Sequence, residues 1–413
     1  MEYKLQEVFD IHNSKRIPLS KMERNKQVNK SFPYYGAQGI IDYVEDFLFN
    51  GEYLLVAEDG ENLKTRNENI AQVANGKFWV NNHAHILSVK ENFNTYYLLN
   101  KLNSMDISGY LTGTVQPKLS RRNLEQIRLN LPDKHTQDKI GNFILKLINK
   151  LQVNQKIIAN LEELSQTLFK RWFVDFEFPD ENGNPYKSSG GEMVDSELGK
   201  IPKYWKVSNL DKIASFVSRG ITPKYNENSD IQIPIINQKV NKGPRLDLQY
   251  IKYFDGQNRI KKELYAQKND LLLNSLGQGT LGRIHLFTRK SEEFLIDQHI
   301  SIIRFDNINY SYFYYAHINT DLIQGQIDSL ISGSTGMLML NITKIRNLKV
   351  ILPTEELVLK YSELVNEYFG KITQLIYENE NLTQLRDTLL PKLMSGEIEI
   401  PDDIEVMEDE LSI

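Results

Sequence analysis

The chain has 413 residues, 40% of them hydrophobic and 25% charged, with a formal net charge of −5, so it is long enough for two or three domains with substantial cores. It contains no cysteine, which excludes disulfides, thiolate zinc sites and iron–sulfur clusters. No apolar run reaches the length of a membrane span and the N-terminal sequence lacks a signal-peptide pattern, so we expect a soluble, cytoplasmic protein.

The charged residues are distributed unevenly along the chain. Residues 1–132 carry 16 basic and 15 acidic side chains, residues 204–353 carry 19 and 13, and residues 354–413 carry 4 and 15. Because phosphate binding depends on local charge, the basic excess of the second region permits a face that binds nucleic acid. The alternative interpretation is ordinary scatter of charge together with an acidic, solvated tail.

The region before residue 132 has the pattern of a mixed domain in which short strands dominate. Strand-like runs bounded by Asp-Gly and Asn-Gly turn signals lie at 53–57, 79–80 and 86–89. A short helix, a small polar loop, and a second short helix leading into a strand are expected at 94–102, 108–114 and 119–132. Residues 204–353 repeat this order, with strand-like runs at 270–274 and 296–303 and a polar loop at 332–336.

After Pro132 and again after Pro353 the apolar spacing changes to about 3.5 residues, which predicts two long helices of roughly 40 residues, or about 60 Å each. The first seam consists of Ile140, Ile144, Leu147, Leu151, Ile158 and Leu161, and the second of Tyr361, Val365, Tyr368, Ile372, Asn379 and Leu382. Alternating steps of four and three residues are typical of coiled coils, so we expect the two helices to pair in antiparallel orientation, with Leu147 and Tyr368 each facing the other helix. Two independent amphipathic helices, each packed on its own domain, are the alternative.

One module occurs twice in this chain. LEELSQTLFKRWF, at 161–173, matches LTQLRDTLLPKLM, at 382–394, and the same offset of 221 residues carries Leu119, Leu124, Leu131 and Pro132 onto Leu340, Ile345, Leu352 and Pro353. A duplicated module predicts pseudo-two-fold symmetry and a partner that is itself bipartite.

The sequence contains no convincing catalytic motif. The G-x-G-x-x-G at 277–282 is followed by the alternating strand pattern of Arg283 to Phe287, so we interpret it as a hairpin turn rather than a dinucleotide site. A P-loop and an Asn/Asp-Pro-Pro-Tyr/Phe segment are both missing. His83 and His85 have the spacing of a metal pair but lack an acidic cluster nearby. His83 and His299, at matching places, are interpreted as core or hinge histidines within strands, with direct ligand contact as the alternative.

Polar loops recur at equivalent places in the two modules and are the candidate DNA contacts. Asn, Gln, Arg and Lys make directional hydrogen bonds to base edges, whereas Ser, Thr and Lys suit phosphates. In the first module the candidates are Tyr35, Gln38, Thr65, Arg66, Thr112, Thr114, Gln116 and Lys118. In the second they are Lys224, Asn237, Gln238, Lys239, Asn274, Ser275, Gln278, Arg283, Ser334 and Thr335. Of these, Gln38, Thr65, Gln116, Gln238, Asn274 and Thr335 are expected to face the major groove.

With these features, the chain resembles the specificity subunit of type I restriction-modification systems. The segments that carry the resemblance are YYGAQGIIDYV at 34–44, LEELSQTLFKRWFVDF at 161–176, FEFPDENGNPYKSSGG at 176–191, ELGKIPKYWKV at 197–207 and LTQLRDTLLPKLMSGEI at 382–398. The resemblance implies an α+β fold with two strand-rich target recognition domains and two conserved helical spacers that pair as an antiparallel coiled coil. The boundaries expected on this basis are 1–132 for the first recognition domain, 133–177 for the central spacer, 178–203 for a linker, 204–353 for the second domain, 354–397 for the C-terminal spacer and 398–413 for an acidic tail.

The resemblance also implies a function without catalysis in this chain. The subunit would read a bipartite, interrupted target on double-stranded DNA, bind two modification subunits that carry S-adenosylmethionine and methylate adenine, and position restriction subunits that cut DNA. A protein-binding scaffold with a coiled-coil centre is the alternative from a different class. Neither the target sequence nor its spacer length can be deduced from one chain, because base preference depends on loop geometry.

Overall fold

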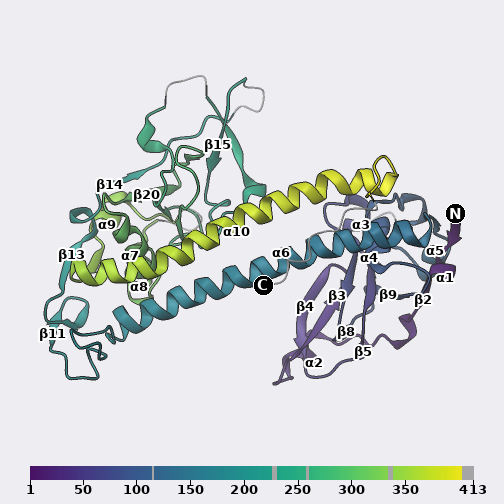
Figure 1. Cartoon of the computed structure of the whole chain (residues 1–413), viewed down its shortest axis with the longest axis horizontal. Helices are drawn as coiled ribbons and strands as arrows, with labels where there is room; N and C mark the ends of the chain where they lie inside the picture. The colour runs from purple at the N-terminus through teal and green to yellow at the C-terminus, as the bar shows by residue number, and fades with distance from the viewer. Residues whose placement is uncertain (114–115, 226–229, 257–259, 334–337, 402–413) are drawn as a thin grey trace. The chain divides into compact units, whose positions relative to one another are not determined.

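Two long helices are present where the heptad pattern predicts them. The computed structural model, which describes residues 1–113, 116–225, 230–256, 260–333 and 338–401, contains α6 (Lys134–Phe169) and α10 (Glu355–Ser395) (Figure 1). Helix α6 continues into a five-residue π-type turn at Lys170–Val174, where the amide of Asp175 donates to the carbonyl of Lys170. The position of Lys170 corresponds to Pro391 in α10, which also lies inside the helix. The regular hydrogen-bond ladder is therefore interrupted at the same place in both copies.

The chain divides into two units, and each unit takes part of both long helices. Unit 1 comprises Met1–Val153 and the chain from Asn379 onward, and unit 2 comprises Asn154–Glu378. The division therefore cuts α6 and α10 within their lengths, whereas the sequence pattern treats the helices as separate spacers. The domain boundaries expected from the sequence stay a prediction.

The strands of unit 1 form three sheets. An antiparallel pair has the order β1-β10, a second sheet the order β2-β9-β6-β7, and a third the order β4-β3-β8-β5, in which β3 and β8 are parallel. The strands are β1 (Glu2–Lys4), β2 (Phe9–Ile11), β3 (Phe32–Gly36), β4 (Gly39–Val44), β5 (Phe49–Asn50), β6 (Tyr53–Ala57), β7 (Ala71–Ala74), β8 (Lys77–Val80), β9 (Ala84–Val89) and β10 (Arg128–Asn130). Short helices connect them: α1 (Leu5–Val8), α2 (Lys21–Asn25), α3 (Asn62–Thr65), α4 (Thr95–Ser104) and α5 (Arg121–Glu125).

Unit 2 repeats this architecture. The pair β13-β21 and the sheet β14-β20-β17-β18 correspond in order and strand direction to the first two sheets of unit 1. The sheet β16-β15-β19 corresponds to β4-β3-β8 of the third sheet, without a counterpart of β5 among the described strands, and β11-β12 is an added hairpin. The strands are β11 (Met193–Ser196), β12 (Gly199–Pro202), β13 (Lys206–Asn209), β14 (Phe216–Arg219), β15 (Gln232–Ile236), β16 (Lys252–Asp255), β17 (Leu271–Asn274), β18 (Ile284–Leu286), β19 (Leu295–Ile296), β20 (Ile300–Arg304) and β21 (Lys349–Leu352). The helices are α7 (Ile308–Ile318), α8 (Asp321–Leu330) and α9 (Ile342–Arg346). The predicted duplication and α+β fold class are confirmed.

Equivalent helices begin with equivalent caps. Asn94 accepts the amides of Tyr96 and Tyr97 at the start of α4, and Asn307 accepts the amide of Asn309 at the start of α7. Ser120 and Asn341 cap α5 and α9 in the same way. These side chains satisfy amides that a helix leaves without an internal partner, and each contributes about 1 kcal/mol.

Within each unit the two long helices contribute to one hydrophobic core. In unit 1, Ile140 and Ile144 of α6 lie in the same cluster as Leu393 of α10. In unit 2, Ile158 and Phe169 of α6 lie with Val365 and Ile372 of α10. The predicted seam residues Leu151, Leu161, Tyr368 and Leu382 are half-buried. A continuous coiled coil stays a prediction, but the helices do not pack independently of each other within either unit.

The heptad pattern also contains polar positions that the sequence analysis omitted. Asn154 and Ser165 continue the seam of α6 and are only 1% and 4% exposed.

No helix in the described ranges is long and apolar enough to span a membrane.

Candidate nucleic-acid interface

Four loop segments of the first module are joined by backbone hydrogen bonds. The amide of Glu58 donates to the carbonyl of His83 (2.9 Å), and that of Leu119 donates to Glu58 (2.8 Å). The amide of Gly60 donates to Pro117 (3.1 Å), and the amide of Asn81 donates to Tyr35 (3.0 Å). We call this arrangement, formed by residues 35–38, 58–60, 81–83 and 117–119, the first loop hub.

The second module contains the same arrangement, with the same donors and acceptors at equivalent places. The amide of Ser275 donates to His299 (2.9 Å), and that of Leu340 donates to Ser275 (2.8 Å). The amide of Gly277 donates to Leu338 (3.2 Å), and the amide of Asp297 donates to Ile236 (2.9 Å). Residues 236–239, 275–277, 297–299 and 338–340 are the second loop hub. Each hub thus gathers loops that are far apart in the sequence, and the two hubs contain seven of the eighteen predicted DNA contacts.

The hairpin that the sequence predicts at 277–282 lies beside the second hub. Strands β17 and β18 pair in antiparallel register on either side of it, so the G-x-G-x-x-G motif forms a turn and opens no helix. Gly277, Gly279 and Gly282 all have positive φ angles, a backbone conformation that residues with a Cβ atom rarely adopt. The glycines therefore serve the turn, and the predicted hairpin is confirmed.

Several predicted DNA contacts are exposed at or near the hubs. In the first module these are Gln38, Thr65, Thr112, Gln116 and Lys118, and in the second Lys224, Lys239, Gln278 and Arg283, with Gln238 half-buried. Thr112 pairs with Lys118 through two backbone hydrogen bonds of 2.9 and 2.7 Å, as Ser332 does with Met339 in the second module. The polar loop next to each hub therefore begins and ends at a fixed backbone pair.

Other predicted contacts have structural roles, and we withdraw them from the candidate set. Asn274 and Ser275 are completely buried, and the side-chain amide of Asn274 donates to the carbonyls of Gln238 and Asn241. Asn237 is 6% exposed and its side chain accepts the amide of Lys239 at 2.8 Å. Such buried polar groups fix loops through their own hydrogen bonds and cannot reach a base without refolding.

Arg66 and Tyr35 are also occupied within the first module. The guanidinium of Arg66 donates to the carbonyls of Asn103 (2.7 Å) and Met105 (3.1 Å) at the C-terminal end of α4, where cations satisfy helix carbonyls. The ring of Tyr35 packs edge-on against Phe78 at 5.6 Å. The sequence placed both in loops without indicating these partners. Thr114, Ser334 and Thr335 lie outside the described residues.

The prediction that His83 and His299 lie inside strands is wrong. Each occupies the turn just before a central strand, β9 or β20, and their side chains are 49% and 27% exposed. The buried histidine of that segment is His85, which bonds to Asn13 and to the carbonyl of Leu119. No group of three or more potential metal ligands occurs within the described ranges.

The charges of the first hub are largely compensated. Oε2 of Glu58 lies 2.6 Å from Nη1 of Arg16, and Oε1 of Glu58 lies 3.2 Å from Nζ of Lys118. Burial acts to raise the pKa of Glu58, but the hydrogen bond from Arg16 and the nearby His85 and Lys118 outweigh it, so the pKa is lowered. Lys118 therefore has one carboxylate partner already, which reduces the positive potential that this hub presents to phosphate.

The second hub is bordered by lysines and tyrosines that the sequence analysis missed. The ammonium nitrogen of Lys242 lies 4.6 Å from the ring centroid of Tyr250, and that of Lys252 lies 4.9 Å from the ring centroid of Tyr225. Both tyrosines are more than 40% exposed. The hydroxyl of Tyr225 donates to Asp297 of the hub (3.1 Å), while burial and this carboxylate raise the tyrosine pKa. Lys224 and Lys239 have no ion-pair partner among the described residues. The alternation of lysine and tyrosine between 242 and 253 was the available signal.

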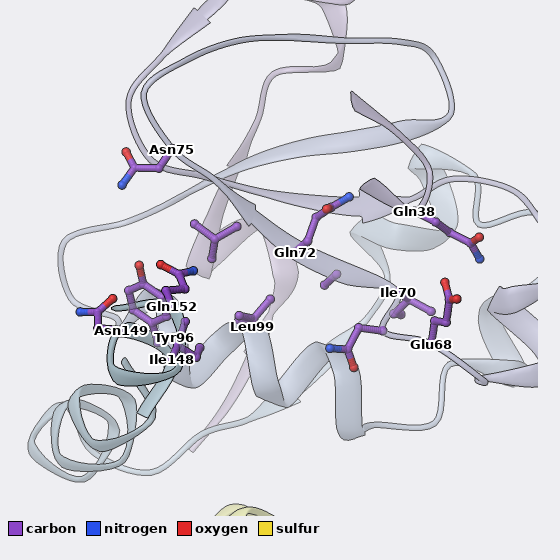
Figure 2. A pocket seen from close by; sticks show the side chains of 13 residues that line it. Gln38, Glu68, Ile70, Gln72, Asn75, Tyr96, Leu99, Ile148, Asn149 and Gln152 are labelled. Atoms are coloured by element: carbon purple, nitrogen blue, oxygen red, sulfur yellow. The ribbon is translucent and has the colours of Figure 1, made fainter. Parts of the chain in front are cut away.

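Unit 1 also contains an open groove of about 510 Å³ between the edge strand β7, α4 and α6. Figure 2 shows Gln38 and Glu68 at one end and Asn149 and Gln152 of α6 at the other, with Gln72 between them. Its lining residues, all in the described part of unit 1, include one carboxylate and neither lysine nor arginine. Phosphate binding requires positive charge, so this groove does not suit DNA.

The second module fills the equivalent place with aromatic rings. Ile148 of the groove corresponds to Phe369 of α10, which stacks on Tyr312 at 5.3 Å and meets Tyr315 edge-on at 5.8 Å. The two copies therefore share a backbone plan but not the packing of side chains along the long helices.

Comparisons with known proteins agree with the duplication. A family model described as "Type I restriction modification DNA specificity domain" matches residues 1–163 and 202–358. The chain is 25% identical over 409 residues to the type I restriction enzyme HindI specificity subunit of Haemophilus influenzae, covering 87% of each chain. It is 27% identical over 301 residues to the type I restriction enzyme MjaIX specificity subunit of Methanocaldococcus jannaschii, covering 72% of this chain and 66% of the relative. A crystal structure of the type I restriction-modification system S subunit from M. genitalium has the same fold, with a TM-score of 0.61, 15% identity and 95% of both chains covered.

Proposed function

Because the chain belongs to the type I restriction modification DNA specificity family, we propose that it is the non-catalytic subunit that reads a bipartite, interrupted DNA target for a type I restriction-modification complex. Each module reads one half of the target. The chain itself carries out no chemistry, and the modification subunits supply S-adenosylmethionine and the methyl transfer.

The observation that carries this proposal is the duplicated loop hub. The same four backbone hydrogen bonds hold equivalent loops in both modules, although the loop side chains differ. A scaffold that is retained while its exposed side chains vary is what two half-sites of different sequence require. Exposed glutamines supply a donor and an acceptor to base edges, and exposed lysines contact phosphates.

Within the revised set, Gln38, Gln116 and Thr65 read bases in the first half-site, and Gln238 and Gln278 read bases in the second. Lys118, Lys224, Lys239 and Arg283 contact phosphates. The first module has less uncompensated positive charge at its hub, so a larger share of its phosphate affinity comes from the modification subunit bound beside it. Replacing one base-reading side chain should cost about 1 to 3 kcal/mol for the matching base pair.

The long helices hold the modules for binding to one duplex. We propose that α6 and α10 pair along their lengths as a coiled coil, bind two modification subunits, and fix the number of base pairs between the half-sites. Equivalent faces of a duplex recur about every 34 Å, so helix length and spacer length are coupled. Restriction subunits join this complex and cut DNA.

The decisive experiment is methylation profiling of DNA from a host that expresses this chain with and without its modification subunit. The expected result is a new interrupted adenine-methylation motif that appears only when both are present. A stable complex of the two proteins that methylates no motif and binds DNA without marked salt dependence would refute the proposal, because phosphate contacts release counterions and weaken steeply with salt.

A further inference from the structure

We propose that His83 and His299 are equivalent DNA contacts, one in each loop hub, each presenting the Nε2 edge of its imidazole to a polar atom of the duplex. This inference rests on the proposed function and adds two residues to it. Neither histidine was among the contacts predicted from the sequence.

The two histidines occupy the same place in the duplicated fold. Each is the third residue of a turn, Asn81-Asn82-His83 or Asp297-Gln298-His299, that leads into a central strand. In each turn the side-chain oxygen of the first residue accepts the histidine amide at 2.8 Å. The histidine carbonyl then accepts the hub amide of Glu58 or Ser275. The backbone of both residues is therefore fixed by the hub.

A carboxylate lies beside Nδ1 of each imidazole ring as well, but it comes from a different place in each module. Nδ1 of His83 hydrogen-bonds to Oδ2 of Asp59 at 2.8 Å, and Asp59 belongs to the neighbouring loop. Nδ1 of His299 lies 2.6 Å from Oδ1 of Asp297 in the same turn, but without the geometry of a hydrogen bond. In both modules the carboxylate is therefore on the Nδ1 side of the ring.

The remaining nitrogen of each ring is available for a ligand. Among the residues that the structure describes, Nε2 of His83 and of His299 has no hydrogen-bond partner. A ring whose Nδ1 lies at a carboxylate presents Nε2 on the opposite side. With the single proton of a neutral ring on Nδ1, Nε2 accepts from the exocyclic amine of adenine or cytosine, whereas a ring with protons on both nitrogens donates from Nε2 to a phosphate oxygen or to guanine.

The experiment uses the complete complex with the modification subunit and DNA that contains the methylated motif. His83→Ala, His299→Ala and the double variant are compared with His12→Ala, a histidine of unit 1 outside the hubs whose Nε2 already bonds to Ser88. Affinity for target and for non-target DNA is measured at several salt concentrations, and melting temperature is measured for each protein. We expect each hub variant to weaken target binding by roughly 5- to 100-fold, with His12→Ala unchanged.

The pattern of the loss identifies the group of the DNA that each histidine contacts. A base contact predicts weaker binding of the target alone and relaxed preference at one base pair of the matching half-site. A phosphate contact predicts similar weakening on target and non-target DNA, with the salt slope smaller by about one. Either pattern supports the inference, provided that His83 affects one half-site and His299 the other.

A structural role gives a different result. If alanine lowers the melting temperature, His83→Phe and His299→Phe are used instead, because phenylalanine keeps an aromatic ring of similar shape but has no ring nitrogen. Wild-type binding by stable variants would overturn the inference and leave the proposed function intact. Failure of the unsubstituted complex to bind or methylate any DNA would refute the proposed function itself.

Discussion

The two modules have the same strand order and the same loop hub, but they differ in how the ends of the long helices are packed. In unit 2 the π-type turn that continues α6 enters a cluster of aromatic rings. The ring centroid of Phe173 lies 4.8 Å from that of Phe313 and 5.2 Å from that of Tyr361. In unit 1 the equivalent end of α10 places Met394 at the edge of an aliphatic core. Duplication has thus preserved the backbone hydrogen bonds, which depend little on side-chain identity, while the cores have diverged.

The strongest test of this difference is to truncate the same register position in both copies. Phe173→Ala removes a 3% exposed ring from the aromatic cluster and should destabilise unit 2 by about 3 to 5 kcal/mol. Met394→Ala removes a half-buried side chain and should cost unit 1 less than half of that. Hydrogen exchange followed by mass spectrometry resolves the two units by their peptides. Equal losses in both units would show that the cores are equivalent after all.

A second difference between the modules concerns buried histidines. Burial lowers the pKa of His285 to about 4 and that of His317 to about 3, and the amide of Ile351 donates to Nε2 of His317, which requires an unprotonated nitrogen. Both residues lie in unit 2, whereas the described part of unit 1 contains one buried histidine with a pKa lowered by burial, His85. The folded-state pKa values of His285 and His317 are below that of an unfolded histidine, so the unfolded chain binds protons first as the pH falls below about 6.5.

Unit 2 should therefore lose stability on acidification from pH 7.5 to pH 5, by about 2 kcal/mol for each histidine. A Trp79→Phe variant leaves Trp172 and Trp205, both in unit 2, as the fluorescent reporters of urea unfolding. The unfolding midpoint should fall at pH 5 and should not change between pH 7.5 and pH 8.5. An unchanged midpoint at pH 5 would mean that these histidines become accessible before the unit unfolds.

The third difference between the modules lies in the helix contacts at the equivalent positions Gly141 and Ser362. A Cβ atom at Gly141 would lie 1.9 Å from Oδ1 of Asn94, the N-cap of α4, so Gly141→Ala should cost about 1 to 3 kcal/mol through the lost cap and strain. Ser362 donates to the carbonyl of Asn309 at 2.9 Å, and Ser362→Ala should cost about 1 kcal/mol.

Gly370 provides the control for both substitutions, because a Cβ atom there meets nothing within 4 Å inside α10. Gly370→Ala should stabilise the helix by about 0.5 to 1 kcal/mol. Denaturation of the three variants under the same conditions checks the order of their effects. If Gly141→Ala were as stable as the parent, Asn94 would have another rotamer that still caps α4.

These positions also show what the sequence could and could not predict. Repeated Leu-Pro boundaries and heptads indicated the duplication and the long helices, because periodicity and helix stops are local signals. The hubs could not be predicted, since their hydrogen bonds join backbone groups far apart in the chain and leave no pattern in residue identity. For the same reason Asn274 and Arg66 looked like DNA contacts: polarity marked them as functional, but only their tertiary partners reveal that they are buried or bound to carbonyls.

The histidines illustrate the same limit in the opposite direction. His83 and His299 stand next to apolar strand residues, a pattern typical of an interior position, yet both lie one residue before the strand in an exposed turn. A residue just outside a strand belongs to the turn, and its side chain need not follow the alternation of faces along the strand. The matching positions of the two histidines were visible in the sequence, whereas their exposure and their carboxylate partners were not.

The smallest expected effect comes from exchanging the residues that make the groove open in one module and filled in the other. Phe369→Ile removes a ring that stacks on Tyr312 and is 8% exposed, and should cost about 1 to 2 kcal/mol. Ile148→Phe places a ring into open space and should change stability by no more than about 0.5 kcal/mol. Leu164→Ala and Leu385→Ala, at equivalent positions that are exposed in both copies, are the matched controls and should be near neutral.

If Ile148→Phe instead stabilised unit 1 as much as Phe369→Ile destabilised unit 2, the groove would be an ordinary packing defect that a ring can fill. A neutral result together with lost methylation would mean that the groove is kept open because the complex uses it.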